Sequence, residues 1–465
     1  MTLRRTFAGT TLRSLRAARG MKQADLAKAI GISASYLSQL ESDDRPLTPA
    51  IFDRLRSNFP VEWQDVPVDQ SAELLRAFED AMSDTHSRDP QSSAQVRKIV
   101  EQFPSFAESF IQLARVNRDN SQRLEMLDEA LGADNLAGGR LPWEEVRDWF
   151  HNINNYVDDL DRLAEAFSHE LANDTLSPST QNLVSWLNDK NISLIFSDKG
   201  PVRLFDEQQS TLTINTAKAN DSLRFHLAWH ISSTHFNEDI ATISSNADVR
   251  SKTARNLLSI GLTNYMAGSI LMPYEQFRSM ARDMRHDVDR LRHLFNVTFE
   301  QVCHRLSTLQ RPNARGTPVY FCRVDLAGNI TKRHSATRLR FARFGGACPL
   351  WVVHEAAAVP DRIHIQLAEM PDGVRYVSMA KGLVKPTGSY AERPRRYAVA
   401  LGCEVDFAAE FVYADEINLS HPATPIGASC RTCSRHNCDQ RAFPPNGKDI
   451  SIDSFRREVV PYSID

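Results

Sequence analysis

Residues 20–48 constrain the fold of this chain more than any other stretch. Leu26 and Ile30 recur four residues apart, as the buried positions of a short helix do, and Gly31 interrupts that helix. Ser33 follows at the position where a side-chain oxygen caps the next helix by accepting a backbone N–H bond. The stretch therefore predicts two short helices joined by a tight turn.

The second of these helices presents slim or hydrogen-bonding side chains on its outer face. The residues left facing outward are Ala34, Ser35, Tyr36, Ser38 and Gln39. A helix that lies in the DNA major groove needs such residues near its N-terminus, because they reach the base edges without steric clash. Together these features resemble the Cro/C1-type helix-turn-helix from about Leu12 to Leu55, with one departure: Lys22 stands where such domains often carry a capping Thr.

Charge supports the same interpretation. Residues 1–58 hold ten Lys and Arg against five Asp and Glu, whereas the whole chain has a formal net charge of −3. A local basic excess is typical of a domain that contacts phosphates. The predicted DNA-contacting residues are Arg13, Lys22, Gln23, Ser33, Ser35, Tyr36, Ser38, Gln39 and Arg45.

At 465 residues the chain is too long for a single core. It contains no apolar run long enough to span a membrane and no signal-peptide core at its N-terminus, so a cytoplasmic protein is expected. We predict an all-α N-terminal part, comprising the helix-turn-helix and a helical connector, followed by α+β middle and C-terminal domains. The predicted boundaries are 1–60, 61–140, 141–310 and 311–465.

The connector contains three apolar helical stripes, which would serve either as scaffold or as dimer contacts. Segments 59–68, 83–93 and 132–140 have the composition of linkers. In the middle domain, three short strands are expected between residues 192 and 214. In the C-terminal domain, alternating patterns predict two hairpins and a further strand at 395–402.

His226 and His230 lie four residues apart on a predicted helix and therefore share one face. This segment resembles the metal helix of the ImmA/IrrE-like peptidases, but Leu227 stands where a zinc peptidase has its catalytic Glu. That family has an acidic third ligand just ahead of an Asn, but the stretch Ser259–Thr263 before Asn264 contains no carboxylate. Zinc proteolysis is therefore not expected, and either a small-ligand pocket or two ordinarily packed histidines remain. The predicted pocket residues are Tyr156, Arg203, His226, His230 and Tyr265.

Three of the seven cysteines cluster near the C-terminus, in the pattern Cys430-x2-Cys433-x4-Cys438. Such spacing suits thiolate ligation of a metal or cluster, and neighbouring arginines favour the thiolate form. Cys403 is the preferred fourth ligand, with Cys348 as a second thiol and His436 as the local alternative. An iron–sulfur cluster, a 4Fe–4S cluster above all, is favoured over zinc in part because the chain resembles a family with such a cluster, while free reactive cysteines remain the simplest alternative.

Further blocks follow in order from the middle helix to just past the cysteines. They include Asn296–Val302, Arg323-Val324-Asp325, Cys348-Pro349, Met370–Gly373 and Gln440–Pro445. With the helix-turn-helix and the peptidase-like segment, this order resembles the short-chain fatty-acyl transcriptional regulator family of bacteria over nearly the whole chain. The resemblance implies control of propionate, glyoxylate or related acyl-CoA metabolism genes. It also implies CoA or an acyl-CoA as effector and an iron–sulfur cluster at the C-terminal cysteines.

The sequence therefore predicts a non-enzymatic DNA-binding regulator that acts as a homodimer or higher homo-oligomer on double-stranded operator DNA. Two alternatives remain open at this point. One is a DNA-binding metallopeptidase that cleaves a partner repressor, and the missing Glu at position 227 argues against it. The other is an antitoxin-like DNA-binding module without a ligand, which a closed middle pocket would favour.

Overall fold

The computed structural model describes residues 8–60, 70–83, 93–131, 142–172, 175–219, 222–341, 346–385, 387, 389–453 and 455–464. The chain forms two compact units, residues 1–135 and 136–465. Most of the predicted linker residues, in 61–69, 84–92 and 132–141, lie outside the described residues. Within the described residues, no helix is both long and apolar enough to cross a membrane.

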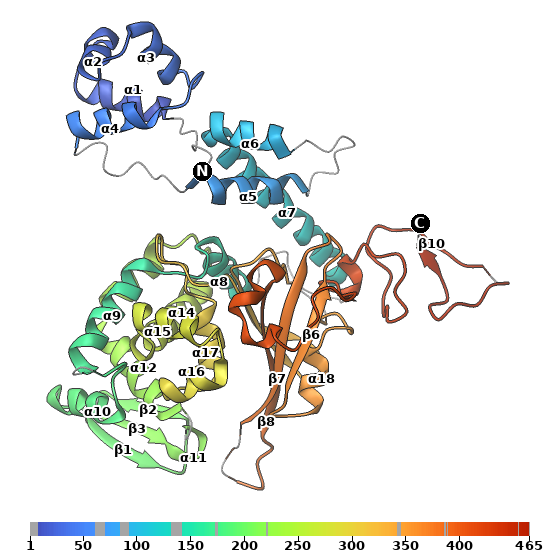
Figure 1. Cartoon of the computed structure of the whole chain (residues 1–465). Coiled ribbons are helices and arrows are strands. Elements are labelled where there is room, and N and C mark those ends of the chain that lie inside the picture. The colour runs from blue at the N-terminus through green and yellow to red at the C-terminus, as the bar shows by residue number, and fades with distance from the viewer. Residues whose placement is uncertain are drawn as a thin grey trace. The chain divides into compact units, whose positions relative to one another are not determined.

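Unit 1 begins with a four-helix domain built around one small core (Figure 1). Its helices are α1 Gly9–Ala18, α2 Gln23–Ala29, α3 Ala34–Glu41 and α4 Pro49–Asn58. Leu26 and Leu37, which the sequence assigns to the buried faces of α2 and α3, have no exposed surface. The predicted helix–turn–helix is therefore confirmed.

The rest of unit 1 consists of three helices, α5 Gln70–Ser83, α6 Ser93–Gln102 and α7 Pro104–Leu131. Phe78 of α5, Val100 of α6 and Ile111 of α7 form their shared core. The apolar spacing read from the sequence brings these faces together, as expected for amphipathic helices.

Unit 2 starts with helices and a three-stranded sheet that lies at the edge of the unit (Figure 1). The helices are α8 Pro142–Asn152, α9 Asp158–Ala172, α10 Thr180–Asp189, α11 Thr216–Ala219, α12 Leu223–His235, α13 Asn237–Asn246, α14 Lys252–Leu271, α15 Tyr274–Asp283, α16 Val288–Leu294 and α17 Phe299–Leu306. The strands are β1 Ser193–Ser197, β2 Arg203–Asp206 and β3 Thr211–Asn215, in the order β1-β3-β2. β3 pairs parallel with β1 and antiparallel with β2. All three strands were expected from the sequence.

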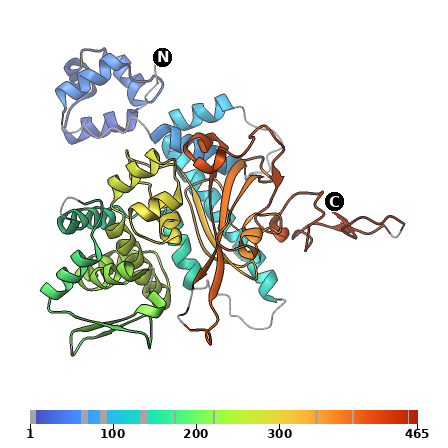
Figure 2. The ribbon, with the colours of Figure 1, turned by 60° about the horizontal axis from the view of Figure 1, so that its bottom comes forward.

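The remainder of unit 2 is a six-stranded sheet in the order β5-β4-β8-β7-β6-β9. Its strands are β4 Tyr320–Asp325, β5 Ile330–Ser335, β6 Ile363–Glu369, β7 Arg375–Lys385, β8 Arg395–Glu404 and β9 Thr424–Pro425. All neighbours are antiparallel except β6 and β9. The two predicted hairpins are confirmed and join through β8 in the middle. Helices coloured green to yellow lie between the small sheet and the orange strands of this sheet (Figure 1, Figure 2).

Side chains alternate between the two faces of the six-stranded sheet. Met379 and Leu401 pack with residues of α15 and α17 on one face, and Ala380 and Ala400 pack toward α18, Val353–Ala358, on the other. Small residues on the second face let α18 approach closely. At Gly382 a β-carbon would stand 2.1 Å from the backbone oxygen of Ala356, so this position of β7 accepts no side chain.

Candidate functional site

The recognition helix α3 is capped as the sequence predicts. The Ser33 hydroxyl accepts a bond of 3.1 Å from the backbone N–H of Tyr36. Gly31 makes the preceding turn with φ of +66°, which a residue with a side chain adopts with strain. Ser35 and Ser38 are exposed on the outer face and Gln39 is partly exposed, so these side chains are available to base edges.

A buried carboxylate joins three of the four helices of the DNA-binding domain. Glu41 of α3 accepts bonds from Arg16 Nε at 2.8 Å and from the Gln23 side-chain amide at 2.9 Å. Gln23 is therefore held in a fixed orientation, with its amide oxygen left for another partner. Lys22 donates its backbone N–H to the Asp25 side chain, which is the half of a capping box that does not involve the Lys22 side chain.

The predicted phosphate contacts lie on the surface of this domain. Arg13, Lys22 and Arg45 are all exposed, and the Arg45 guanidinium lies 5.7 Å from the centre of the Tyr36 ring. A cation packed against an aromatic face keeps its charge while losing some freedom of movement. The geometry is that of a helix-turn-helix with its outer face open, and the individual base and phosphate contacts remain predictions.

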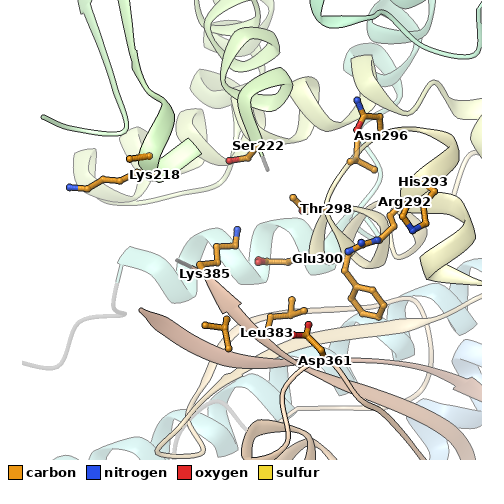
Figure 3. Close-up of a pocket in the computed structure, with 14 residues that line it drawn as sticks. Lys218, Ser222, Arg292, His293, Asn296, Thr298, Glu300, Asp361, Leu383 and Lys385 are labelled. Carbon is orange, nitrogen blue, oxygen red and sulfur yellow. The ribbon is translucent and has the colours of Figure 1, made fainter. Parts of the chain in front are cut away.

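Unit 2 contains two adjoining cavities of about 340 and 380 Å³. Both are bordered by α11, by residues at and after the start of α17, and by the end of β7. Their shared wall consists of Lys218, Ser222, Thr298, Glu300 and Lys385. In the smaller cavity, Glu300 and Lys385 lie side by side, with Lys218 and Ser222 to one side and Arg292 and His293 to the other (Figure 3).

The larger cavity is strongly cationic. Among the described residues that line it, Glu300 is the one acid, against six basic residues: Lys218, Arg305, Arg323, Lys332, Lys385 and Arg395. Glu300 accepts bonds from Arg323 at 3.1 Å and from the Tyr397 hydroxyl at 2.8 Å. Burial favours its neutral form, but Lys332, Arg323 and Lys385 outweigh burial and lower the pKa of Glu300. The positive charge that remains suits an anionic ligand, phosphate esters in particular.

Two of the five predicted pocket residues, His226 and Tyr265, line the larger cavity. The other three do not line either of the two cavities. Arg203 packs on Trp229, with its guanidinium 3.2 Å from the ring centre. His230 is buried against Phe205, with ring centres 4.4 Å apart, and Tyr156 belongs to the apolar core beside the sheet. The sequence pattern therefore indicated two residues that border the larger cavity, one on α12 and one on α14, but it did not indicate the basic residues that line the rest of it.

The two histidines of α12 are held in their neutral form. Burial, and then the positive charge of Arg203, lowers the pKa of both His226 and His230 to about 4. Leu227, at the position of a peptidase Glu, is fully buried in the core. Within the described residues, no three His, Cys, Asp or Glu side chains are arranged to hold a metal ion.

A buried ion pair supports the floor of the larger cavity. Asp161 of α9 is fully buried and accepts bonds from Arg305 of α17 at 2.7 and 2.8 Å. The Tyr265 hydroxyl donates to the same carboxylate at 2.5 Å, and its own pKa is raised by burial and then by Asp161. Tyr265 therefore offers a ligand its ring, because its hydroxyl is already engaged. The hydroxyl of Tyr156, another of the predicted pocket residues, accepts a bond of 2.9 Å from Arg311 Nε.

Four basic cavity residues that the sequence did not indicate come from the C-terminal sheet. Arg323, Lys332, Lys385 and Arg395 sit on four different strands, β4, β5, β7 and β8. Each is an ordinary strand residue by local pattern. Only the pairing of these strands and their packing against α17 brings the charges together, so no short motif marks them.

Cys348 lies beside the C-terminal cysteine loop. Burial raises the pKa of its thiol, and the thiols of Cys430 and Cys433 act in the same direction. Cys433 is itself buried and sits so close to Gly427 that a β-carbon there would stand 2.8 Å from its Sγ. Cys430 and Cys438 are partly exposed. Three thiols arranged as a finished ligand set are absent from the described residues.

Cys403, the fourth ligand preferred from the sequence, lies elsewhere. It is fully buried on β8 opposite Val377, in the apolar core on the α17 side of the sheet. Burial, and then the nearby carboxylates of Glu410 and Glu404, raises its pKa to about 12. Of the two thiols considered for this role, the structure places Cys348, not Cys403, next to the loop. His436 Nδ1 lies 3.3 Å from the carbonyl oxygen of Ile464.

Three family models match successive parts of the chain. Residues 12–66 match a helix-turn-helix, residues 194–307 an IrrE N-terminal-like domain, and residues 308–462 the C-terminal domain of the short-chain fatty acyl coenzyme A regulators. The three matches follow the order expected from the sequence.

Several similar proteins extend over almost the whole chain. One, the "Propionyl-CoA carboxylase regulator" of Cereibacter sphaeroides, is 41% identical over 460 residues, 98% of each chain. In Mycobacterium tuberculosis, the "HTH-type transcriptional regulator PrpR" is 39% identical over 99% of this chain and 96% of its own, and RamB is 35% identical over 99% of both. A solved structure titled "Mycobacterium tuberculosis transcriptional regulator" is 40% identical and covers 70% of this chain and 100% of its own, with a TM-score of 0.65. The chain belongs to the short-chain fatty acyl coenzyme A regulator family of helix-turn-helix transcriptional regulators.

Proposed function

We propose that this protein is a cytoplasmic regulator that binds operator DNA through α3 and controls genes of acyl-CoA metabolism in response to CoA or a short-chain acyl-CoA. The observation that carries the proposal is a cation-lined cavity within a chain that aligns end to end with a regulator named for propionyl-CoA carboxylase. An effector would act by favouring the conformation with one DNA affinity over another.

The chemistry of the two cavities matches a CoA thioester. The larger one offers guanidinium and ammonium groups of the kind that hold phosphates. The smaller one adds apolar side chains, Val297, Phe299, Leu383 and Val384, which suit a short acyl chain. Because the two cavities share one wall, a single elongated molecule would occupy both.

The effector proposal is tested by isothermal titration of the full chain with propionyl-CoA. Lys385→Gln should weaken binding about 10- to 100-fold, because a hydrogen bond to a charged group contributes about 1.5–3 kcal/mol. Lys199→Gln, an equal change of charge at an exposed lysine outside both cavities, is the control and should bind as the parent does. Equal affinity of the two variants would exclude these cavities as the site.

We also propose that Cys430, Cys433 and Cys438, with Cys348 as fourth ligand, hold an iron–sulfur cluster. The proximity of Cys348 to two of the loop cysteines supports this set. A bound cluster would order the loop, since metal binding and local folding are coupled in such sites. The chain's part would be to supply the thiolates and, through Arg431, Arg435 and Arg441, nearby positive charge.

The cluster proposal is tested by iron and zinc analysis and by visible absorption of anaerobically purified protein. Cys348→Ser should lose the absorption, whereas Cys403→Ser should keep it. Stoichiometric zinc without iron would show that the cysteines hold a structural zinc ion and no cluster. Full absorption in Cys348→Ser would remove this residue from the ligand set.

The IrrE-like part of the chain is proposed to have no peptidase activity. The support is chemical: a buried leucine stands where the general base is needed, and the stretch Ser259–Thr263 offers no carboxylate as third ligand. Incubation with zinc and a labelled protein substrate should yield no cleavage. Cleavage that is lost in His226→Ala would restore the metallopeptidase alternative.

A further inference from the structure

The first half of α7 carries an exposed row of large apolar side chains. Phe103, immediately before the helix, is 59% exposed, Phe106 is 60% and Leu113 is 65%. The other side of the helix is covered, because Ala107 and Ile111 are buried against α5 and α6 (Figure 1). Phe110, between Phe106 and Leu113, is partly buried, with its ring centre 5.0 Å from that of Phe78 in α5. The open part of the row is therefore Phe103, Phe106 and Leu113, and an exposed apolar group of this size marks an interaction surface.

This row follows a seven-residue repeat. Its positions are spaced alternately by three and four residues, which is the a and d pattern of a coiled coil. The residues at these positions are Phe103, Phe106, Phe110, Leu113, Asn117 and Asn120. In the sequence the repeat continues with Leu124, Leu127 and Leu131, up to the end of α7. We call positions 103–131 of this pattern the α7 seam.

Two asparagines in the middle of the α7 seam indicate what covers it. Asn117, at an a position, and Asn120, at a d position, are both exposed. An asparagine at an a position pairs with its own copy across a parallel two-stranded coiled coil and fixes the register. An unrelated apolar surface would leave both amides without partners, whereas a second α7 in register offers each amide an identical one.

We propose that the α7 seam pairs with that of a second copy of this chain as a parallel, in-register two-stranded coiled coil. Dimeric helix-turn-helix proteins read two half-sites about one helical turn of DNA apart, so a symmetric link next to the DNA-binding domain serves that function. The pairing depends on neither the effector nor the cluster. Residues 136–465 of the same chain are the alternative cover, and the experiment distinguishes them.

The test is disulfide trapping in the full-length chain. In the parallel pair, the two copies of residue 106 face each other, so Phe106→Cys should form a covalent dimer on mild oxidation. Arg115→Cys lies at an exposed f position, on the side away from the seam, and should give no more dimer than the parent with its native cysteines. Mass spectrometry identifies the peptide that joins Cys at position 106 to itself.

Each outcome of the trapping experiment either supports or overturns the proposed parallel pair. In an antiparallel pair about the middle of the seam, residue 106 would face residue 124, and the two copies of residue 106 would stand about 27 Å apart. No dimer at Phe106→Cys therefore overturns the proposal, whether the seam is antiparallel or covered by residues 136–465. Equal yields from Phe106→Cys and Arg115→Cys also overturn it.

A second variant pair checks that the trapped contact is the seam itself. Leu113→Glu, added to Phe106→Cys, should lower the yield of dimer at least threefold, because two carboxylates would face each other at one d position. Gln112→Glu introduces the same residue at the neighbouring exposed c position and should leave the yield unchanged. Because Leu113 is outside the core of α5, α6 and α7, the change leaves the helices folded. An unchanged yield in Leu113→Glu contradicts the proposal.

Discussion

Removal of Arg305 should destabilise unit 2 through one buried carboxylate. In Arg305→Met, Asp161 keeps its burial and loses two bonds of 2.7 and 2.8 Å, and the backbone oxygen of Met272 loses a third of 2.9 Å. Removing one partner of a buried ion pair costs about 3–5 kcal/mol, because the other charge is left in a low-dielectric interior.

The size of the expected change in melting temperature follows from the length of the unit. Residues 136–465 amount to 330 residues, and an unfolding entropy of about 2.1 cal/mol/K per residue gives roughly 0.7 kcal/mol/K for the unit. The loss in Arg305→Met therefore corresponds to about 4–7 °C in differential scanning calorimetry of the ligand-free full chain.

Two further variants make the experiment decisive. Arg162→Met breaks a pair with Asp158 of similar geometry, 2.8 Å, on the same α9, but both side chains are about half exposed, so the melting temperature should stay near that of the parent. Asp161→Leu combined with Arg305→Met removes both charges and should cost less than the sum of the single variants. If Arg305→Met melts no lower than Arg162→Met, the reasoning from burial is refuted.

Three other predictions concern separate parts of the chain. Gln39→Ala should cost about 1–3 kcal/mol of discrimination at one base pair, whereas Arg13→Ala should weaken all duplexes alike and flatten the salt dependence; fluorescence anisotropy at several salt concentrations separates the two effects. Ser33→Ala should lower the unfolding free energy of the DNA-binding domain by about 0.5–2 kcal/mol, measured by urea titration. An unchanged urea midpoint would show that the Ser33 cap does not stabilise the domain. Because the folded pKa of His230 is about 4, below the unfolded value near 6.5, its contribution to stability is present above pH 6.5 and is lost as the pH falls toward 4. His230→Gln should therefore lose less stability than the parent over that interval, and parallel curves would contradict this account.

Local signals in the sequence were sufficient for the DNA-binding domain and the strands. The cap at Ser33, the break at Gly31 and the spacing of Leu26 and Ile30 all act over a few residues, and the structure keeps each of them. Alternating strand patterns likewise depend on neighbours in the chain.

The effector cavity depends on contacts between segments far apart in the sequence. Lys218 and Lys385 share a wall only because α11 and the end of β7 meet in the fold. Neither residue has a local context that distinguishes it from an ordinary surface lysine. The prediction from α12 therefore identified His226 and the ring of Tyr265 but assigned the charge to Arg203, whose guanidinium packs on Trp229.

The preference for Cys403 over Cys348 could have been avoided. Cys403 is two residues from Leu401 and four from Val399 on one strand, so alternation places all three on the same apolar face. A thiol on that face packs in the core and does not reach a loop on the surface. Cys348 precedes α18 on the other face, where the loop cysteines also lie.

Strand β7 contains two positions with very different freedom to change during evolution. Gly382 is closed to every other residue, because the first carbon of any side chain would collide with the backbone of α18. Lys385, three residues further along, borders both cavities and is partly open to solvent. Substitutions at the first position are eliminated by failure to fold, whereas those at the second leave the scaffold intact and change only what the cavities attract. Descendants of this chain can therefore diversify in ligand preference along one edge of the sheet without rebuilding the sheet.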